Sequence, residues 1–372
     1  MNNRHRIAIV GAGVAGMALA ILATRKGYQV CLYERDSEVS SMGAGVTLWP
    51  NAIFVLQQLG LAREIERLGG APRFMRQFDQ AGVRNAELDI EAVNALSGFP
   101  SVTILRRDLM TVLADTLDEL GIERHFGCSM TAADIGRLKQ AFDLVVGADG
   151  RMNSVVRQTL FADPVRPSYQ GFINIIGISH REEGVRENAV QDFRGQGERF
   201  GIVPVQAGTC YWAAAWRTPM DKARPLSAWY DELDERFRYW PPAVKAVLRC
   251  REPTSLNRIF VHDLDPLPYW HRDNVLIVGD AAHAPLPTSG QGACQALEDA
   301  WHLCRCLQEN TSLGGALTNF YRCRIDKVTA AQTVGRQLAQ RLFADYAEPR
   351  DSAPAISAEQ LSQFWMQGLA VD

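Results

Sequence analysis

The N-terminal segment, residues 6–34, constrains the fold more than any other part of the chain. It reads as an apolar strand, the glycine pattern GAGVAG, an alanine-rich helix to about Lys26, and a second apolar strand that ends at Glu34. This order of strand, GxGxxG loop, helix, strand and acid is typical of a dinucleotide-binding α/β unit. We therefore predict a parallel sheet with a phosphate site between the first strand and the helix.

Each glycine of this pattern has its own expected task. Gly11 makes the tight turn, Gly13 lets a pyrophosphate approach the backbone, and Gly16 lets the helix pack closely on the sheet. Glu34 is placed to accept hydrogen bonds from an adenosine ribose. Arg35, directly after that acid, is either a 2′-phosphate contact or a surface arginine at a strand end. The pattern alone does not separate NAD from FAD.

Composition and charge exclude several other classes of protein. The chain has 372 residues, 47% of them hydrophobic, and a net charge of −3, which suits two domains or one large split domain and argues against a nucleic-acid partner. We expect no signal peptide and no membrane span. The eight cysteines lack metal-ligand spacing, so we expect a cytoplasmic protein with reduced thiols and no metal site.

Two later apolar runs also end in glycine plus an acid. Residues 143–146 lead into GADGR, which contains Asp149, and residues 274–278 lead into GDAAHAPLPTSGQGA, which begins with Gly279 and Asp280. Asp-Gly is a common turn pair, but three strand ends of this kind in one parallel sheet predict one extended ligand along its carboxyl edge.

With these three motifs, the chain resembles the single-component FAD-dependent aromatic hydroxylases, the para-hydroxybenzoate hydroxylase-like flavoprotein monooxygenases. The resemblance extends from about residue 6 to about residue 345 and includes GAGVTLWPNA at 43–52 and RRDL at 106–109. It implies an enzyme with tightly bound FAD that uses NADH or NADPH and O₂ to hydroxylate a small aromatic or N-heteroaromatic substrate through a flavin C4a-hydroperoxide. A flavin oxidase or reductase on the same fold is the alternative.

The resemblance also implies which residues contact FAD. Arg106 and Asp280 would reach the ribityl-phosphate region, and Asp149 is associated with both FAD and the pyridine nucleotide. Between residues 127 and 143 the chain departs from the family's longer β-hairpin, which weakens the case for an adenine contact at Met130. The full expected set is Gly11, Gly13, Gly16, Glu34, Arg35, Val46, Thr47, Arg106, Met130, Asp149, Asp280, Pro287, Gly290, Gln291, Gly292 and Ala293.

The uncharged loop 285–292 suggests how the flavin ring would be held. Reduced flavin carries negative charge at its N1–C2=O edge, and a helix that begins near Gln291 would offer free N–H groups and a positive dipole end to that charge. His283 lies in the same motif, where we expect a structural hydrogen bond rather than catalysis.

The resemblance and the strand pattern together predict an α/β fold: a Rossmann-like FAD-binding domain with an inserted antiparallel β-sheet substrate domain and C-terminal helices. We expect the FAD-binding domain at 1–70, 101–166 and 263–345, the substrate domain at 71–100 and 167–262, and a C-terminal linker and helix at 346–372.

The substrate should lie between this second sheet and the loop 285–292, which we call the flavin loop. The expected substrate contacts are Phe193, Trp212, Trp216, Pro287 and Thr288, although we expect at least half of the aromatic side chains on this sheet to be sheet core instead. Family members that hydroxylate urate carry an aspartate in place of Thr288, so urate is a poor candidate.

Catalytic assistance would come from the sheet, because Asp280 is committed to the cofactor. Tyr211, Arg199 and His180 are the candidates to orient or polarise the substrate. We expect a monomer or homodimer.

Overall fold

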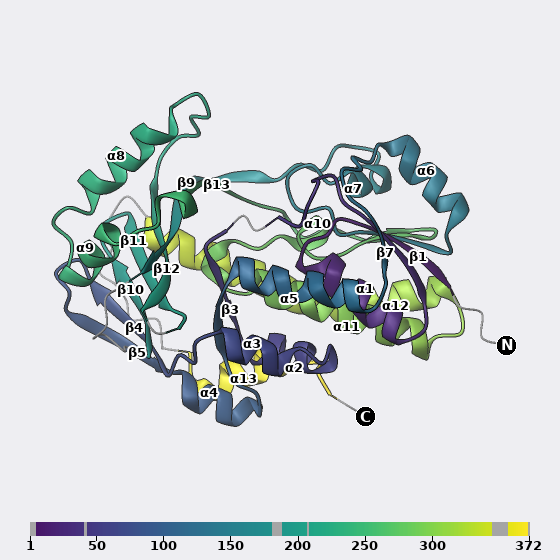
Figure 1. The fold of residues 1–372 in the computed structure, drawn as a ribbon, viewed down its shortest axis with the longest axis horizontal. Helices are drawn as coiled ribbons and strands as arrows, with labels where there is room; N and C mark the ends of the chain where they lie inside the picture. Colours follow the sequence, from purple (N-terminus) through teal and green to yellow (C-terminus); the bar gives the residue numbers. More distant parts are fainter. Residues whose placement is uncertain (1–4, 41–42, 181–187, 207, 344–355, 371–372) are drawn as a thin grey trace.

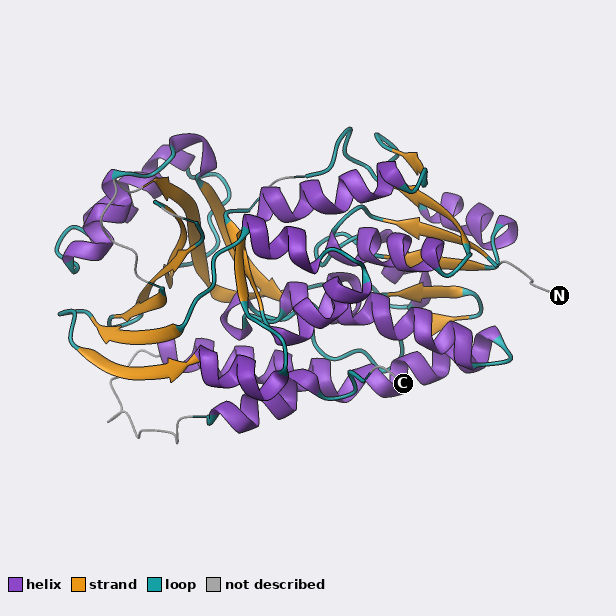
Figure 2. Cartoon of the chain, turned by 60° about the horizontal axis from the view of Figure 1, so that its bottom comes forward, coloured by secondary structure: helices purple, strands orange, loops and turns teal. Residues whose placement is uncertain are grey.

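The computed structural model describes residues 5–40, 43–180, 188–206, 208–343 and 356–370. Figure 1 shows two parts side by side, one built around a sheet with helices packed about it and one built around a larger, curved sheet. The mixed α/β composition is plain in Figure 2 and confirms the predicted fold class. Among the described residues, no helix is both long enough and apolar enough to cross a membrane.

The first part contains a six-stranded sheet in the order β14-β15-β8-β1-β2-β7. Its pairs are parallel except β14 with β15. The carboxyl ends of three adjacent strands, β1, β8 and β15, carry the three predicted motifs, so the motifs meet at one edge. The strand bounds are β1 (Arg6–Val10), β2 (Gln29–Tyr33), β7 (Glu123–His125), β8 (Leu144–Gly147), β14 (His271–Arg272) and β15 (Val275–Ile277).

Helices pack against this sheet because their apolar residues are buried. The alanine-rich α1 is buried from Val14 to Ala23 and packs against α11. The short α6 begins with a capping box between Thr131 and Asp134. The helices of this part are α1 (Val14–Arg25), α5 (Arg106–Glu119), α6 (Ala132–Ala141), α7 (Val155–Leu160), α10 (Asp280–His283), α11 (Gly292–Glu309) and α12 (Leu313–Phe343).

The second part is a seven-stranded sheet in the order β13-β9-β12-β11-β10-β4-β5, antiparallel except for β10 with β4. Its strands come from the two segments without nucleotide motifs. Helices α8 (Leu226–Arg236) and α9 (Pro242–Arg249) pack on one of its faces. The strand bounds are β4 (Phe74–Asp79), β5 (Arg84–Asp89), β9 (Ser168–His180), β10 (Ala189–Arg194), β11 (Glu198–Pro204), β12 (Thr209–Arg217) and β13 (Asn257–Asp263).

A two-stranded ribbon of β3 (Gly45–Leu48) and β6 (Val102–Leu105) lies where the two parts meet. Below it in Figure 1, the C-terminal helix α13 packs against α4 and α2. Most of the predicted linker, residues 346–355, lies outside the described residues. The remaining elements are α2 (Pro50–Gln58), α3 (Ala62–Leu68), α4 (Ile90–Ser97), η1 (Pro253–Ser255), η2 (Pro287–Ser289) and α13 (Ala358–Met366).

Candidate functional site

The glycine loop after β1 is close-packed on one side and open on the other. Gly11 has a φ of +110°, and a Cβ there would lie 2.3 Å from the Ala148 carbonyl oxygen. A Cβ on Gly16 would lie 1.9 Å from the Gly11 carbonyl oxygen. At Gly13, by contrast, no atom of the described residues lies within 4 Å of an added Cβ. The backbone at Gly13 is therefore accessible to a ligand.

The carboxylate of Glu34 lies beside this loop. It accepts hydrogen bonds from the Ala12 amide at 2.6 Å and from the Asp36 amide at 3.1 Å. Arg35, in contrast, is exposed and forms an ion pair with Asp36 at 3.6 Å. The acid is thus held at the glycine loop, whereas Arg35 lies on the surface.

Two arginines and one carboxylate gather at the carboxyl edge of the sheet. The Arg106 side chain lies over Gly43, where a Cβ would come within 2.4 Å of the Arg106 Cδ. Burial lowers the pKa of Arg106, and Asp280 opposes that shift. Arg151 Nε lies 3.8 Å from the Asp280 carboxylate. The group carries a net positive charge, which suits a ligand with phosphates.

Sequence reasoning missed two arginines of this region, although both stand in the stretch GADGRMNSVVR at residues 147–157. Arg151 belongs to the charged group above, and Arg157 is almost fully buried. Arg157 donates to the carbonyl oxygens of Ala281 at 2.9 Å and Arg151 at 2.6 Å, so it ties the second motif to the third. The available signal was the nearness of both arginines in sequence to Asp149, at a strand end already predicted to border the ligand.

Asp149 holds its own loop in place. Its carboxylate accepts from the Ser154 hydroxyl at 2.5 Å and from the Val156 amide at 3.1 Å, at the start of α7. Burial raises the pKa of Asp149, an effect that these hydrogen bonds oppose. Met130 is half-buried against the core of the first part.

The loop 285–293 is held in place by hydrogen bonds to α12 and to Trp49. Its exposed positions include Pro287 and Gly290, whereas Gln291 is buried. The Thr288 hydroxyl donates to the Gly335 carbonyl oxygen of α12 at 2.6 Å, and the Trp49 indole N–H donates to the Gly290 carbonyl oxygen at 3.0 Å. Helix α11 then begins at half-buried Gly292 and Ala293.

His283 has the structural contact that the sequence analysis expected. Its Nε2 lies 2.6 Å from the carboxylate of Asp299, which also accepts from the Gly279 amide at 2.7 Å. Burial alone would raise the pKa of Asp299, but His283 and Arg324 hold it well below its ordinary value. Asp299, which the sequence analysis did not single out, therefore fixes the turn that presents Asp280.

Tyr211 connects the large sheet to β3. Its hydroxyl shares a 2.8 Å hydrogen bond with the Thr47 hydroxyl, and its ring packs directly on Gly45. Burial raises the pKa of Tyr211 far above its ordinary value, so the phenol stays protonated at neutral pH. Burial likewise raises the pKa of Cys294, whose thiol contacts the Thr47 carbonyl, to about 12. Val46 and Thr47 are both half-buried.

Arg199 is anchored by a buried acid on the same face of the sheet as Tyr211. Both Arg199 and Arg194 pair with Asp192, whose side chain is 5% exposed. Burial alone would raise the pKa of Asp192, but the two guanidinium groups hold it below its ordinary value. Between Arg199 and Tyr211 on this face lie only small side chains, Gly201 and Ala213.

The third catalytic candidate lies apart from these two. His180 is exposed at the end of β9, where its Nε2 lies 3.3 Å from Glu252 and its partner across the sheet is Thr209. Arg107 approaches the same carboxylate at 3.6 Å. The structure thus places His180 at the outer end of the face that carries Tyr211.

The predicted aromatic lining is wrong for three residues. Phe193, Trp212 and Trp216 are buried in the cluster between the sheet and helices α8 and α9. Because consecutive side chains of a strand point to opposite faces, Tyr211 and Trp212 cannot both face β3. The face toward β3 carries Tyr211 with aliphatic and small neighbours such as Ile178 and Ala213, whereas these three aromatics belong to the core of the second part.

The edge of the first sheet holds three potential metal ligands, which the sequence analysis did not expect. The ligand atoms of Cys31, Glu123 and His125 all lie within 4.8 Å of one another. Burial raises the pKa of the Cys31 thiol to about 11, whereas Glu123 and His125 are exposed.

Comparisons of sequence agree on the type of cofactor. The family described as FAD binding domain matches residues 4–316. The chain is 30% identical to an aurachin C monooxygenase/isomerase from Stigmatella aurantiaca over 331 residues, which cover 86% of this chain and 85% of that protein. It is 29% identical to an FAD-dependent urate hydroxylase from Mycolicibacterium vanbaalenii, with 79% and 78% of the two chains covered.

Comparison of structure agrees on the fold. The crystal structure of Klebsiella pneumoniae HpxO complexed with FAD and uric acid matches with a TM-score of 0.81 at 24% identity. The match covers 92% of this chain and 90% of that chain. At this identity the likeness concerns the arrangement of the two parts.

Proposed function

The chain belongs to the FAD-binding domain family as an FAD-dependent monooxygenase, and we propose that it uses NADH or NADPH and O₂ to hydroxylate a small aromatic or N-heteroaromatic compound. When bound, FAD supplies the redox chemistry and the activation of O₂. The protein binds and orients both molecules and excludes water from the reaction. Relatives named for salicylate and for 6-hydroxynicotinate support the class of substrate.

The described residues fit this cofactor. The accessible backbone at Gly13 and the two arginines near Asp280 suit a pyrophosphate. Glu34, held at the loop by the Ala12 amide, suits a ribose hydroxyl. The N-terminus of α11, which follows exposed Gly290, suits the electron-rich edge of the ring. Arg35 is not needed for any of these contacts.

The contact between Tyr211 and Thr47 is the observation that carries the proposal for the substrate. It places a protonated phenol of the large sheet beside β3, the strand expected to border the ring. Tyr211 can hold a substrate hydroxyl or carbonyl by a hydrogen bond, but it cannot act as a base at neutral pH because its pKa is raised. Arg199, fixed by Asp192, can bind an anionic oxygen at the other end of the same face.

The environment of Thr288 argues for a substrate that is already electron-rich. Threonine has no carboxylate to remove a proton from the substrate, and the Thr288 hydroxyl already donates its own proton to the Gly335 carbonyl. A ring that carries its own hydroxyl or amino group meets this requirement better than urate does. Pro287, exposed in the same loop, is our candidate to contact that ring.

Oxygen labelling tests the reaction directly. Aromatic compounds would be screened for oxidation of NADH or NADPH, and the product of each active compound formed under ¹⁸O₂ would be analysed by mass. We expect one labelled oxygen in the product. Label that comes from H₂¹⁸O, or cofactor oxidation without oxygen insertion for every active compound, would favour the flavin oxidase or reductase.

A further inference from the structure

We infer that the C-terminal segment, residues 357–370, sets the position of the Gly290 carbonyl, and that Trp365 is a positioning residue for the flavin loop. The segment contains α13 and lies beyond the residues that match the family, 4–316. The inference rests on FAD binding and is independent of the proposed substrate.

The first connection runs through two stacked indoles. The Trp365 ring stacks on Trp49 with 4.5 Å between centroids and 27° between planes. Trp49 follows β3 directly, and its single N–H donates to the Gly290 carbonyl at 3.0 Å. Both indoles are buried, at 5% exposure for Trp49 and 6% for Trp365. Trp365 therefore limits where the donor to Gly290 can lie.

Gly290 is a position where the orientation of a carbonyl depends on such a donor. It has a φ of +64° and ends η2, and Gln291 after it caps α11. A peptide in this left-handed conformation has other accessible orientations, since glycine is the residue least restricted in its backbone. The Trp49 N–H selects one of them and thereby fixes the start of α11, where the flavin ring is expected.

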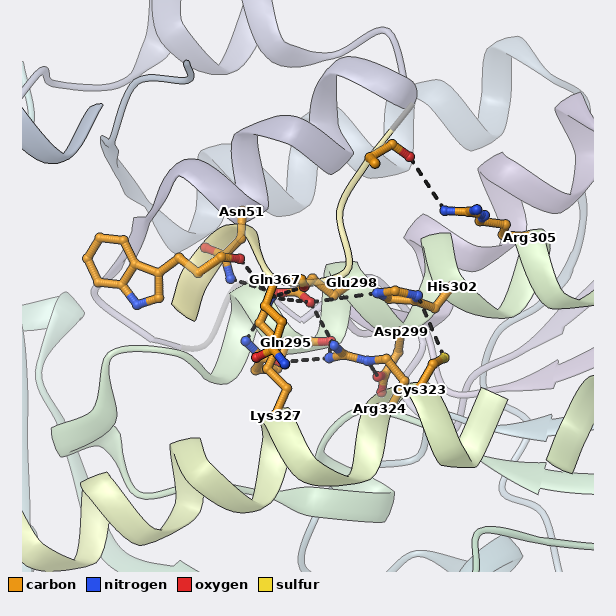
Figure 3. Close-up of polar contacts among 12 residues, drawn as sticks. Asn51, Gln295, Glu298, Asp299, His302, Arg305, Cys323, Arg324, Lys327 and Gln367 are labelled. Atoms are coloured by element: carbon orange, nitrogen blue, oxygen red, sulfur yellow. Dashed lines mark hydrogen bonds and ion pairs between the residues drawn. The ribbon is translucent and has the colours of Figure 1, made fainter. Parts of the chain in front are cut away.

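The second connection runs through a buried lysine. Lys327 of α12 donates to the carbonyl oxygens of Trp365 at 2.7 Å and Gln367 at 3.0 Å, and to the Glu298 carboxylate at 2.9 Å. These three acceptors match the three hydrogens of an ammonium group. The end of α13 also carries the negative end of its dipole. Figure 3 shows Lys327 and Gln367 beside Glu298.

Hydrogen bonds through Glu298 connect Lys327 to the flavin loop. Its other carboxylate oxygen accepts from the Asn51 amide at 2.7 Å, and the same amide nitrogen donates to the Gln291 side chain at 2.9 Å. Lys327 and Asn51 thus link the end of α13 to Gln291, while Trp49 links Trp365 to Gly290. The two connections meet at consecutive residues of the loop.

Two substitutions separate positioning from general stability. Trp365→Ala removes the stack, and Trp49→Phe keeps a ring for stacking but removes the donor to Gly290. We expect each to weaken FAD binding by about tenfold and to shift the visible absorption bands of bound flavin, with Trp365→Phe restoring both. The dissociation constant would be measured by titrating the apoprotein with FAD, and the melting temperature of the apoprotein would be measured alongside.

Ser362→Ala is the matched control. Ser362 lies on α13, and its hydroxyl accepts a hydrogen bond from that of Ser97 on α4 at 2.9 Å, so this side chain belongs to neither of the two connections described above. We expect this variant to bind FAD as the parent does. Unchanged FAD affinity and spectrum in Trp49→Phe, or an equal effect of Ser362→Ala and Trp365→Ala, would overturn the inference. Neither readout depends on the hydroxylation of any substrate.

Discussion

Tyr211 and Gly45 touch across the junction of the two parts of the molecule, so closely that a Cβ on Gly45 would lie 2.1 Å from the Tyr211 Cδ1. The tyrosine belongs to β12 and the glycine to β3. Further along β3, the Thr47 hydroxyl shares a 2.8 Å hydrogen bond with the Tyr211 hydroxyl. The absence of a side chain at residue 45 therefore fixes how near the large sheet can come to β3.

Gly45→Ala should force the Tyr211 ring away from β3. Overpacking of this kind costs about 1–3 kcal/mol of unfolding free energy, and we expect a higher KM for substrate as well. Chemical denaturation and steady-state kinetics would measure the two effects. In a Tyr211→Ala background the same substitution should cost almost nothing, because the clash is gone. Equal losses in both backgrounds would show that the contact does not limit this junction.

The glycine loop allows a second, contrasting pair of substitutions. Gly13→Ala should leave the unfolding free energy of the apoprotein within about 0.5 kcal/mol, because an added Cβ meets no atom of the described residues within 4 Å. It should nevertheless weaken FAD binding, since the methyl group occupies the space of the pyrophosphate. Gly11→Ala should destabilise the apoprotein itself, because of its φ of +110° and the 2.3 Å approach to Ala148. Calorimetry measures the stability of each apoprotein, and FAD titration measures its affinity for the cofactor.

If Gly13→Ala bound FAD like the parent, the pyrophosphate would lie elsewhere.

The sequence was informative where local chemistry and chain order determine the structure. A strand that ends in glycine and acid has few alternatives, and the structure brings the ends of β1, β8 and β15 together as predicted. The run YWAAAW in β12 was different, because it is apolar on both faces and its alternation does not tell which face meets the flavin. Helices α8 and α9 decide that question, since they bury Trp212 and Trp216.

Contacts between distant charged residues could not be predicted either. Arg199 was expected to be available for the substrate, but its pairing with Asp192 depends on the register of β10 with β11. Glu298 and Arg324 look like ordinary helix charges in the sequence, yet both are fully buried and lie 2.6 Å apart. Such pairs become visible only when the helices α11 and α12 are placed side by side.

Arg199→Lys should distinguish charge from geometry at the substrate face. Lysine keeps a positive charge beside Asp192 but loses the planar fork of donors that can bind a second acid or carbonyl. We expect the fold to persist and KM for substrate to rise by about tenfold, with a smaller change in kcat. Arg194→Lys alters the other partner of Asp192 and should leave KM near that of the parent. An equal rise in both variants would assign the effect to Asp192 rather than to Arg199.

Because His302 is buried, we expect the unfolding free energy of the protein to fall in mild acid. Its side chain is 8% exposed and lies 4.0 Å from Glu298, with Arg324 and Lys327 near it and its Nδ1 3.7 Å from the Cys323 sulfur. Burial, followed by the repulsion from those two cations, lowers the pKa of His302 to about 2. The folded protein therefore keeps this imidazole neutral throughout the working range of pH.

The sign of the effect follows from the unfolded chain, where histidine titrates near pH 6.5. Between pH 6.5 and about 2 the unfolded state binds one more proton at His302 than the folded state does, so the unfolding free energy falls as pH falls. The expected slope is about 1.4 kcal/mol per pH unit below 6.5, with no contribution above it. His302→Gln, which cannot titrate, should therefore lose about 1.4 kcal/mol less than the parent between pH 7.5 and pH 5.5. Urea denaturation at the two pH values measures this difference, and parallel losses in the two proteins would mean that His302 has the same pKa in the folded protein as in the unfolded chain.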